Sequence, residues 1–152
     1  IHRDYIGDRV MAYYFTRHGS MTQATTTFSA VEIDSEGATA GPIPLPPDVK
    51  AITSIRASVV VNGAHVTDTG VIIVLRLTGT GALVDGVQEL VLMSEHLEDG
   101  AGTLTYDVEK IIKPLFLPVR IAVNGGADLS VAAAYYGTDA GSPQISVTLE
   151  VV

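Results

Sequence analysis

The histidines are the first residues to consider for metal binding or catalysis. The chain has four, and no two lie two, three or four positions apart: His2, His18, His65 and His96. Short zinc motifs need such spacings, so no zinc site is predicted. Cysteine is absent, which excludes disulfides and thiolate ligands. No Gly-x-Ser-x-Gly segment is present to hold a nucleophilic serine. We therefore expect no cofactor, no metal ion and no catalytic residue.

One triplet, Asp68-Thr69-Gly70, resembles the active-site segment of retroviral-type aspartic proteases. In that family two copies of the triplet meet in a dimer, and their like-charged carboxyls share one proton. The family has two large apolar residues before the aspartate, whereas this chain has His65-Val66-Thr67. A turn signal, Asn62-Gly63, also lies just upstream. We predict that the triplet forms a turn between strands and that Asp68 is not catalytic; a protease is the remote alternative.

Acidic loops and paired aromatic residues favour another alternative, a module that binds carbohydrate or a host surface. The loops Asp34-Ser35-Glu36 and Glu98-Asp99 are acidic, but neither has the alternating oxygen ligands of a calcium-binding loop. The clusters Tyr13-Tyr14-Phe15 and Tyr135-Tyr136 have the rings of a sugar platform. Adjacent residues of a strand point to opposite faces, so we expect one ring of each pair in the core and the other outside.

All these residues must be positioned by β-strands, because the pattern is β nearly throughout. Val, Ile and Thr are abundant, and Gly, Pro, Asn and Asp recur at short intervals. We predict eight strands, at 10–17, 25–33, 51–61, 71–78, 87–94, 117–123, 129–136 and 144–152. Residues 104–111 fit a ninth strand, and 107–113 fit two helical turns equally well. Residues 94–99 fit one further helical turn.

The periodicity of two strands indicates how they lie in a fold. In residues 144–152 apolar and polar side chains alternate, which is typical of an antiparallel sheet with one buried face. Residues 71–75 are apolar on both faces and predict a central strand or a subunit contact. The prolines of 41–47 predict a stiff segment that crosses between sheets, with a polyproline ligand as the alternative. The predicted fold is an all-β antiparallel β-sandwich, an eight-stranded jelly roll.

Composition excludes several classes of function. The chain has 152 residues, of which 47% are hydrophobic and only 17% charged, which fits one domain with a substantial core. Its net charge of -8 argues against binding to duplex nucleic acid or anionic lipid. No apolar run is long enough for a transmembrane segment. Low charge with high hydrophobicity suggests that a neighbouring subunit covers part of the apolar surface.

Charge is distributed unevenly along the chain. We divide it into an N-terminal arm, residues 1–22, and a sandwich domain, residues 23–152. The arm is mildly basic, whereas residues 77–109 hold acids and no Lys or Arg. We predict that the arm contacts the acidic stretch of another copy. The expected interface residues are Arg3, Arg9, Arg17, Tyr13, Tyr14, Glu95, Glu98 and Asp99.

The overall pattern resembles the single-jelly-roll capsid proteins of tailless icosahedral viruses of bacteria and archaea. The resemblance rests on Pro44-Leu-Pro-Pro47 leading into 52–61, on 71–78, on 118–126 and on the closing strand 145–152. It implies a virion structural protein that self-assembles as a homo-oligomer with other shell proteins, without cofactor or catalysis. Phage decoration proteins and other β-sandwich modules share this style. For a binding module, the expected location is extracellular or at the cell surface.

Overall fold

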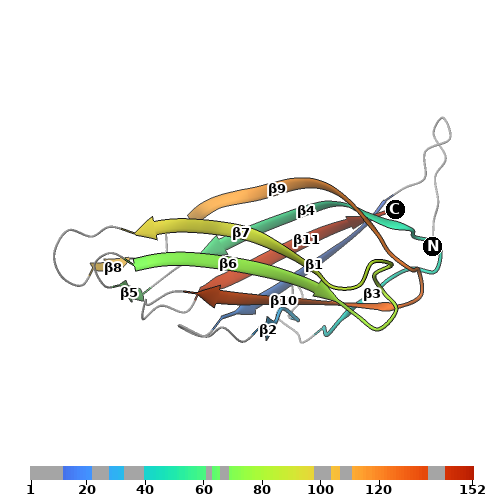
Figure 1. Cartoon of the computed structure of the whole chain (residues 1–152), viewed down its shortest axis with the longest axis horizontal. Coiled ribbons are helices and arrows are strands. Elements are labelled where there is room, and N and C mark those ends of the chain that lie inside the picture. Colours follow the sequence, from blue (N-terminus) through green and yellow to red (C-terminus); the bar gives the residue numbers. More distant parts are fainter. Residues whose placement is uncertain are drawn as a thin grey trace.

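Two antiparallel β-sheets stack to form a β-sandwich in the computed structural model of the chain (Figure 1). The structure describes residues 12–21, 28–32, 40–60, 63–65, 69–97, 104–106, 111–136 and 143–152. Within these ranges every regular element is a strand, and there is no helix. The predicted all-β antiparallel sandwich is confirmed.

The first sheet has four strands in the order β1-β11-β4-β9. Their bounds are Tyr13–Ser20, Gln144–Val151, Ala51–Val60 and Ile111–Ala122. The second sheet has the order β2-β10-β6-β7, with bounds Ser29–Ala30, Asp128–Tyr136, Thr69–Thr78 and Gln88–Leu97. A short strand, β3 (Ile43–Pro44), also pairs with β10. Strands β5 (Gly63–His65) and β8 (Leu104–Tyr106) form a separate two-stranded sheet.

The strand pairings of the two main sheets are nested along the chain. The first main strand pairs with the last, β1 with β11, and the second with the second-last, β2 with β10. Inside these lie β4 with β9 and β6 with β7. All four pairs are antiparallel, so the chain follows the path of one long hairpin rolled across both sheets.

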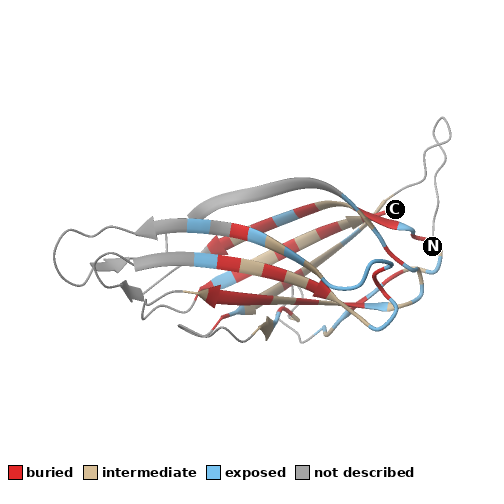
Figure 2. Cartoon of the chain, in the orientation of Figure 1, coloured by how far each residue is buried: buried red, intermediate tan, exposed pale blue. Residues whose placement is uncertain are grey.

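The core lies between the sheets and is built from alternate strand residues (Figure 2). In β11 the buried residues are Ile145, Val147, Leu149 and Val151, with less buried polar residues between them. The predicted alternation is therefore confirmed. Strand β6 is central in its sheet, between β10 and β7, and Ile73 and Leu75 are fully buried.

The proline-containing segment 41–47 carries the chain from one sheet to the other, as predicted. Ile43 and Pro44 pair with the start of β10, and the chain then enters β4 of the first sheet at Ala51. The Leu45 amide donates to the Ala127 carbonyl at 3.0 Å, and the Gly126 amide donates to the Leu45 carbonyl at 2.9 Å. These bonds fix the segment to the turn between β9 and β10.

Several local predictions are corrected. Eleven strands occur in the described residues, rather than eight, because β3, β5 and β8 are additional short ones. Ser94 and the three residues after it continue β7 and form no helical turn. Within residues 104–111, Leu104–Tyr106 form β8 and Ile111 begins β9, and the four residues between them lie outside the described residues. In each case a cross-strand partner supplies the backbone hydrogen bonds that local patterns could not reveal.

Candidate functional site

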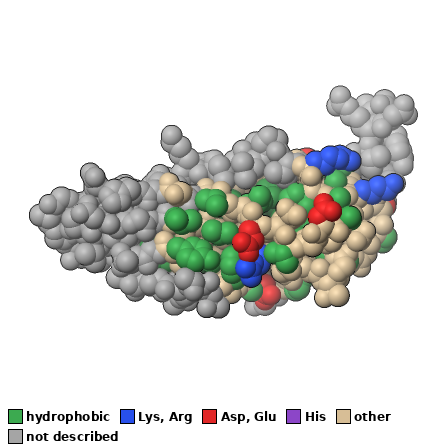
Figure 3. All heavy atoms as spheres, in the orientation of Figure 1, with side chains coloured by type: hydrophobic (Ala, Val, Ile, Leu, Met, Phe, Trp, Pro, Cys, Tyr) green, Lys and Arg blue, Asp and Glu red, His purple; other side chains and the backbone are tan. Residues whose placement is uncertain are grey.

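The outward face of the second sheet is apolar at its centre (Figure 3). Ile72 of β6 is 42% exposed, and Val91 of β7 is 59% exposed. Val74 points outward between them and lies directly opposite Val91 in the strand register. On the other side of β6, Ala134 of β10 lies opposite Val74 and is buried, so the exposed part of this face lies over β6 and β7. Large side chains that remain exposed in contiguous strand positions are typical of an interaction surface.

One ion pair lies within this apolar face. Arg76 and Glu89 are cross-strand partners, two residues along their strands from Val74 and Val91. The Arg76 Nε donates to Glu89 Oε1 at 2.8 Å, and Nη2 donates to the same oxygen. The Phe28 ring lies 3.6 Å from the Arg76 guanidinium carbon, which is a cation–π contact. The stacked ring holds the guanidinium in place.

The outward face of the first sheet is polar instead. Three strands place His18, Ser146 and Ser58 side by side in register, from β1, β11 and β4. One pair further along, Thr16 and Thr148 share a hydrogen bond of 2.9 Å between their hydroxyls. The two sheets therefore present chemically different surfaces to their surroundings.

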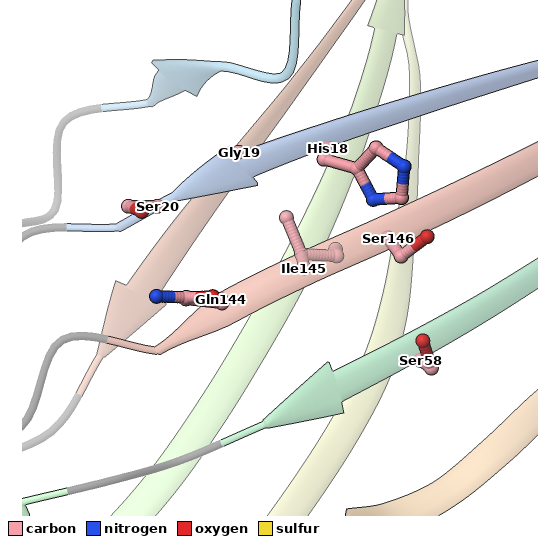
Figure 4. A pocket seen from close by; sticks show the side chains of 7 residues that line it. All are labelled: His18, Gly19, Ser20, Ser58, Gln144, Ile145 and Ser146. Atoms are coloured by element: carbon pink, nitrogen blue, oxygen red, sulfur yellow. The ribbon is translucent and has the colours of Figure 1, made fainter. Parts of the chain in front are cut away.

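An open pocket of about 310 Å³ lies on this polar face (Figure 4). It is lined by His18, Gly19, Ser20, Ser58, Gln144, Ile145 and Ser146. Hydroxyl, amide and imidazole groups can hydrogen-bond a small polar molecule there. The lining contains no phenyl, phenol or indole ring, so it does not form a platform on which sugars stack.

A β-bulge at Thr53 organises a second polar cluster on the first sheet. Opposite β11, Ser54 pairs with Glu150 and Ile52 pairs with the next residue, Val151, so Thr53 is the extra residue of β4. Its hydroxyl donates to Glu150 Oε1 at 2.6 Å, and the Tyr14 hydroxyl donates to Glu150 Oε2 at 2.5 Å. Both bonds favour the charged carboxylate and lower the pKa of Glu150, the bond from Thr53 having the larger effect. The same carboxylate raises the pKa of Tyr14 by accepting its hydrogen bond.

The lowered pKa of Glu150 predicts an acid-dependent contribution to stability. That contribution is complete above the ordinary carboxyl pKa and is lost as the pH falls through the folded-state pKa. We expect Glu150→Gln to destabilise the chain at pH 7 and to have a smaller effect at pH 3. Urea unfolding of both proteins at both pH values measures this difference. A loss that is equal at the two pH values would contradict a role for the carboxylate charge.

Tyr13, Tyr14 and Arg17 are the predicted interface residues whose side chains the structure describes. Tyr13 packs against the core while Tyr14 is 65% exposed, which confirms the expected division of this pair. Tyr135 is buried and Tyr136 is half-buried. Arg17 is only 8% exposed, and its Nε donates to the Gly41 carbonyl at 3.0 Å. This hydrogen bond of Arg17 lies within its own chain and fixes the start of the crossing segment, whereas an interface contact was predicted.

Other predicted residues lie outside the description. Arg3, Arg9, Glu98 and Asp99 are not among the described residues, and Glu95 is described only as backbone in β7. Strand β1, Tyr13–Ser20, lies within the predicted arm 1–22 and forms an edge of the first sheet. The contact between arm and acidic stretch stays a prediction.

Two residues of the Asp68-Thr69-Gly70 triplet, Thr69 and Gly70, do not lie in the predicted turn between strands. Thr69 and Gly70 begin β6 and pair with Leu97 and His96 of β7, because the β6–β7 ladder extends further than its apolar pattern. Asp68 lies outside the described residues. Across the described ranges no three His, Asp or Glu side chains are close enough together to hold a metal ion. No helix that could cross a membrane occurs there.

Sequence reasoning did not single out the residues at the centre of the apolar face, which are Ile72, Val74, Arg76, Glu89 and Val91. A partial signal existed, because residues 71–75 are apolar on both faces and predict a central strand or a subunit contact. The structure confirms the central strand, because β6 lies between β10 and β7 in its sheet. The pairing of Arg76 with Glu89 depends on the register between β6 and β7, which no local pattern reveals.

Comparisons with known proteins give no family for this chain. No protein-family model matches it, and no curated protein matches it. Among solved structures, it is similar to VP2 of infectious bursal disease virus, seen in the crystal structure of a subviral particle. That match has a TM-score of 0.33 and 16% identity, and covers 95% of this chain. The chain spans 33% of the length of VP2.

Proposed function

We propose that this chain is a structural subunit that associates with copies of itself to build a closed shell, without catalysis or cofactor. More specifically, we propose that it is a capsid protein of a virion, with other shell proteins as further partners. The observation that carries the proposal is the exposed apolar face of β6 and β7, with Ile72 and Val91 at 42% and 59% exposure.

The apolar face supports self-association through the hydrophobic effect. Burial of apolar surface contributes roughly 25 cal/mol per Å², so covering this face with a second subunit is favourable. A single contact must also offset the entropy lost on association. A closed shell supplies several contacts for each subunit at once, which makes individually modest interfaces sufficient.

The strand order supports the same proposal. Eight main strands with nested antiparallel pairing, distributed over two four-stranded paths, are the arrangement of a jelly roll. We infer that the sandwich is a jelly roll, a fold that viral capsid domains use. Fold alone does not determine function, so the topology supports the proposal only together with the apolar face.

The difference between the two outer faces also favours a shell subunit. The second sheet presents Ile72, Val74 and Val91, whereas the first presents His18, Ser58 and Ser146. A subunit with one apolar and one polar face can bury the former against its neighbours and leave the latter hydrated. A binding module is expected instead to expose several aromatic rings in a row. Among the described residues with high exposure, Tyr14 is the only aromatic one.

A substitution at Val91 tests the proposal. We expect the full chain to form oligomers or particles at high concentration, visible by light scattering and negative-stain electron microscopy. Val91→Lys places a charge in the apolar face and should weaken association by about tenfold or more, without unfolding the sandwich. Ser20→Lys is the matched control, because Ser20 is an exposed residue of an edge strand in the opposite sheet. This control should associate like the original chain.

The outcomes separate the proposal from its alternatives. A chain that stays monomeric at high concentration would contradict self-assembly and favour the binding module. Association that Val91→Lys leaves unchanged would remove the apolar face as its cause. Strict dimers that cleave peptides, with cleavage abolished by Asp68→Asn, would favour the protease.

A further inference from the structure

The apolar face contains a cation and an anion at opposite positions of two neighbouring strands. This arrangement limits the orientations in which a second copy can pack on the face. Arg76 of β6 and Glu89 of β7 lie directly opposite each other in the strand register. Their neighbours Val74 and Val91 are matched in the same way. Each pair therefore lies at one height along the strands, with one member on each strand.

We propose that two copies pack face to face about a two-fold axis that runs along the strands between β6 and β7. This inference rests on the proposed function and names the geometry of its first contact. Rotation about that axis keeps each residue at its height and exchanges the two strands. Arg76 of one copy then faces Glu89 of the other, and Val74 faces the other copy's Val91. The interface is isologous, so each copy contributes both halves of every contact.

The hydrogen bonds within one copy leave capacity for this exchange. Arg76 uses Nε and Nη2, and both donate to the same oxygen of Glu89, Oε1. The Nη1 group of the guanidinium and the Oε2 atom of the carboxylate take no part in these two bonds. The Arg76 and Glu89 side chains are 37% and 48% exposed, so both are accessible to a second copy. Phe28 stacks on the guanidinium and holds it in place, which lowers the entropy lost on binding.

Charge reversal on one member of the pair tests the geometry. In a two-fold interface Arg76→Glu places acid against acid, and Glu89→Arg places base against base. Each variant alone should self-associate about tenfold or more weakly than the original chain at low salt. An equimolar mixture should form heterodimers, because both intermolecular pairs then become complementary. Native mass spectrometry distinguishes the heterodimer from either homodimer by mass.

The mixing experiment does not respond to the interaction between residues 76 and 89 within one chain. That pair stays repulsive in both variants, so heterodimer formation reports only contacts between copies. A chain carrying both Arg76→Glu and Glu89→Arg restores the internal pair and should self-associate like the original chain. Arg120→Glu is the control for the change in net charge, because Arg120 is an exposed residue of β9 in the other sheet. It should not respond to mixing with Glu89→Arg.

Failure of this inference is distinguishable from failure of the proposed function. If the original chain associates, Val91→Lys prevents it and the mixture gives no heterodimers, the two-fold geometry is wrong and the apolar interface remains. If either reversed variant alone associates as strongly as the original chain, the exchange of the ion pair is wrong. If the original chain does not associate at all, the proposed function itself fails.

Discussion

Leu75→Ala should lower the free energy of unfolding by about 2–5 kcal/mol, the range for a leucine truncated in a packed core. Leu75 lies on the central strand β6 and is fully buried. Its cross-strand neighbour on β10 is Ala133, which is also fully buried and too small to fill the space that the leucine leaves. For a chain of this length, each kcal/mol corresponds to roughly 2–4 °C in melting temperature.

The adjacent residue supplies a matched control. Val74 lies on the same strand but points to the outer face, where Val91 is its partner. Val74→Ala should change the free energy of unfolding by less than about 1 kcal/mol at concentrations where the chain is monomeric. Urea and thermal unfolding of the three proteins measure the contrast. A one-residue slip in the register would exchange the two faces, so equal losses, or a larger loss at Val74, would contradict the strand placement.

The direction of each side chain within a strand could be predicted well from sequence, because it depends on a period of two residues. Ile145 and Leu149 are buried as the alternation of 144–152 predicts. The central position of β6 follows from apolar residues on both of its faces. Proline chemistry predicts the crossing segment for a similar reason, since a residue without an amide proton cannot join a central ladder.

Pairing partners could not be predicted, because they depend on contacts between distant parts of the chain. Local signals in residues 104–111 do not reveal that Leu104–Tyr106 pair with β5, whereas Ile111 pairs with β4 of the first sheet. The burial of Arg17 has the same origin. Its partners are the carbonyls of Gly41 and Pro42, more than twenty positions away. A charged residue in an apparently exposed segment therefore stabilises the interior.

The candidate site was the part least open to sequence reasoning. The predicted interface consists of charges on an arm and on an acidic stretch, because the charge of a segment can be read directly from its sequence. The apolar face instead arises where Ile72 and Val91, nineteen positions apart, project from neighbouring strands on the same side. It needs the β6–β7 register, including the shift between Ile73 and Val74. Only the structure supplies that register.

Gly125→Ala should destabilise the chain by about 3 kcal/mol or more, through a clash at one end of the sandwich. A Cβ at Gly125 would lie 2.4 Å from the Pro47 carbonyl oxygen and 2.6 Å from that of Pro46. Both obstacles are backbone atoms in the crossing segment, so no side-chain rotation relieves them. The glycine allows the β9–β10 turn to lie directly against this segment.

Neither partner can move away easily, because hydrogen bonds hold both on either side of the contact. The Gly126 amide donates to the Leu45 carbonyl at 2.9 Å, and the Val123 amide donates to the Lys50 carbonyl at 2.9 Å. To accommodate a methyl group, the chain must break one of these bonds or displace the segment between Leu45 and Lys50. Either change disturbs the entry into β4, an inner strand of the first sheet whose Ile55 side chain lies in the core.

Gly86→Ala is the appropriate comparison, because it separates the clash from the general effect of replacing a glycine. Gly86 has a φ of 86°, which L-residues rarely adopt, but nothing lies within 4 Å of its Cβ position. Its replacement should cost about 1–2 kcal/mol from backbone strain alone. Urea unfolding gives both losses, and limited proteolysis at Lys50 reports whether the crossing segment has detached. If Gly125→Ala were no more destabilising than Gly86→Ala, the crossing segment would have room to move and would not fix the end of the sandwich.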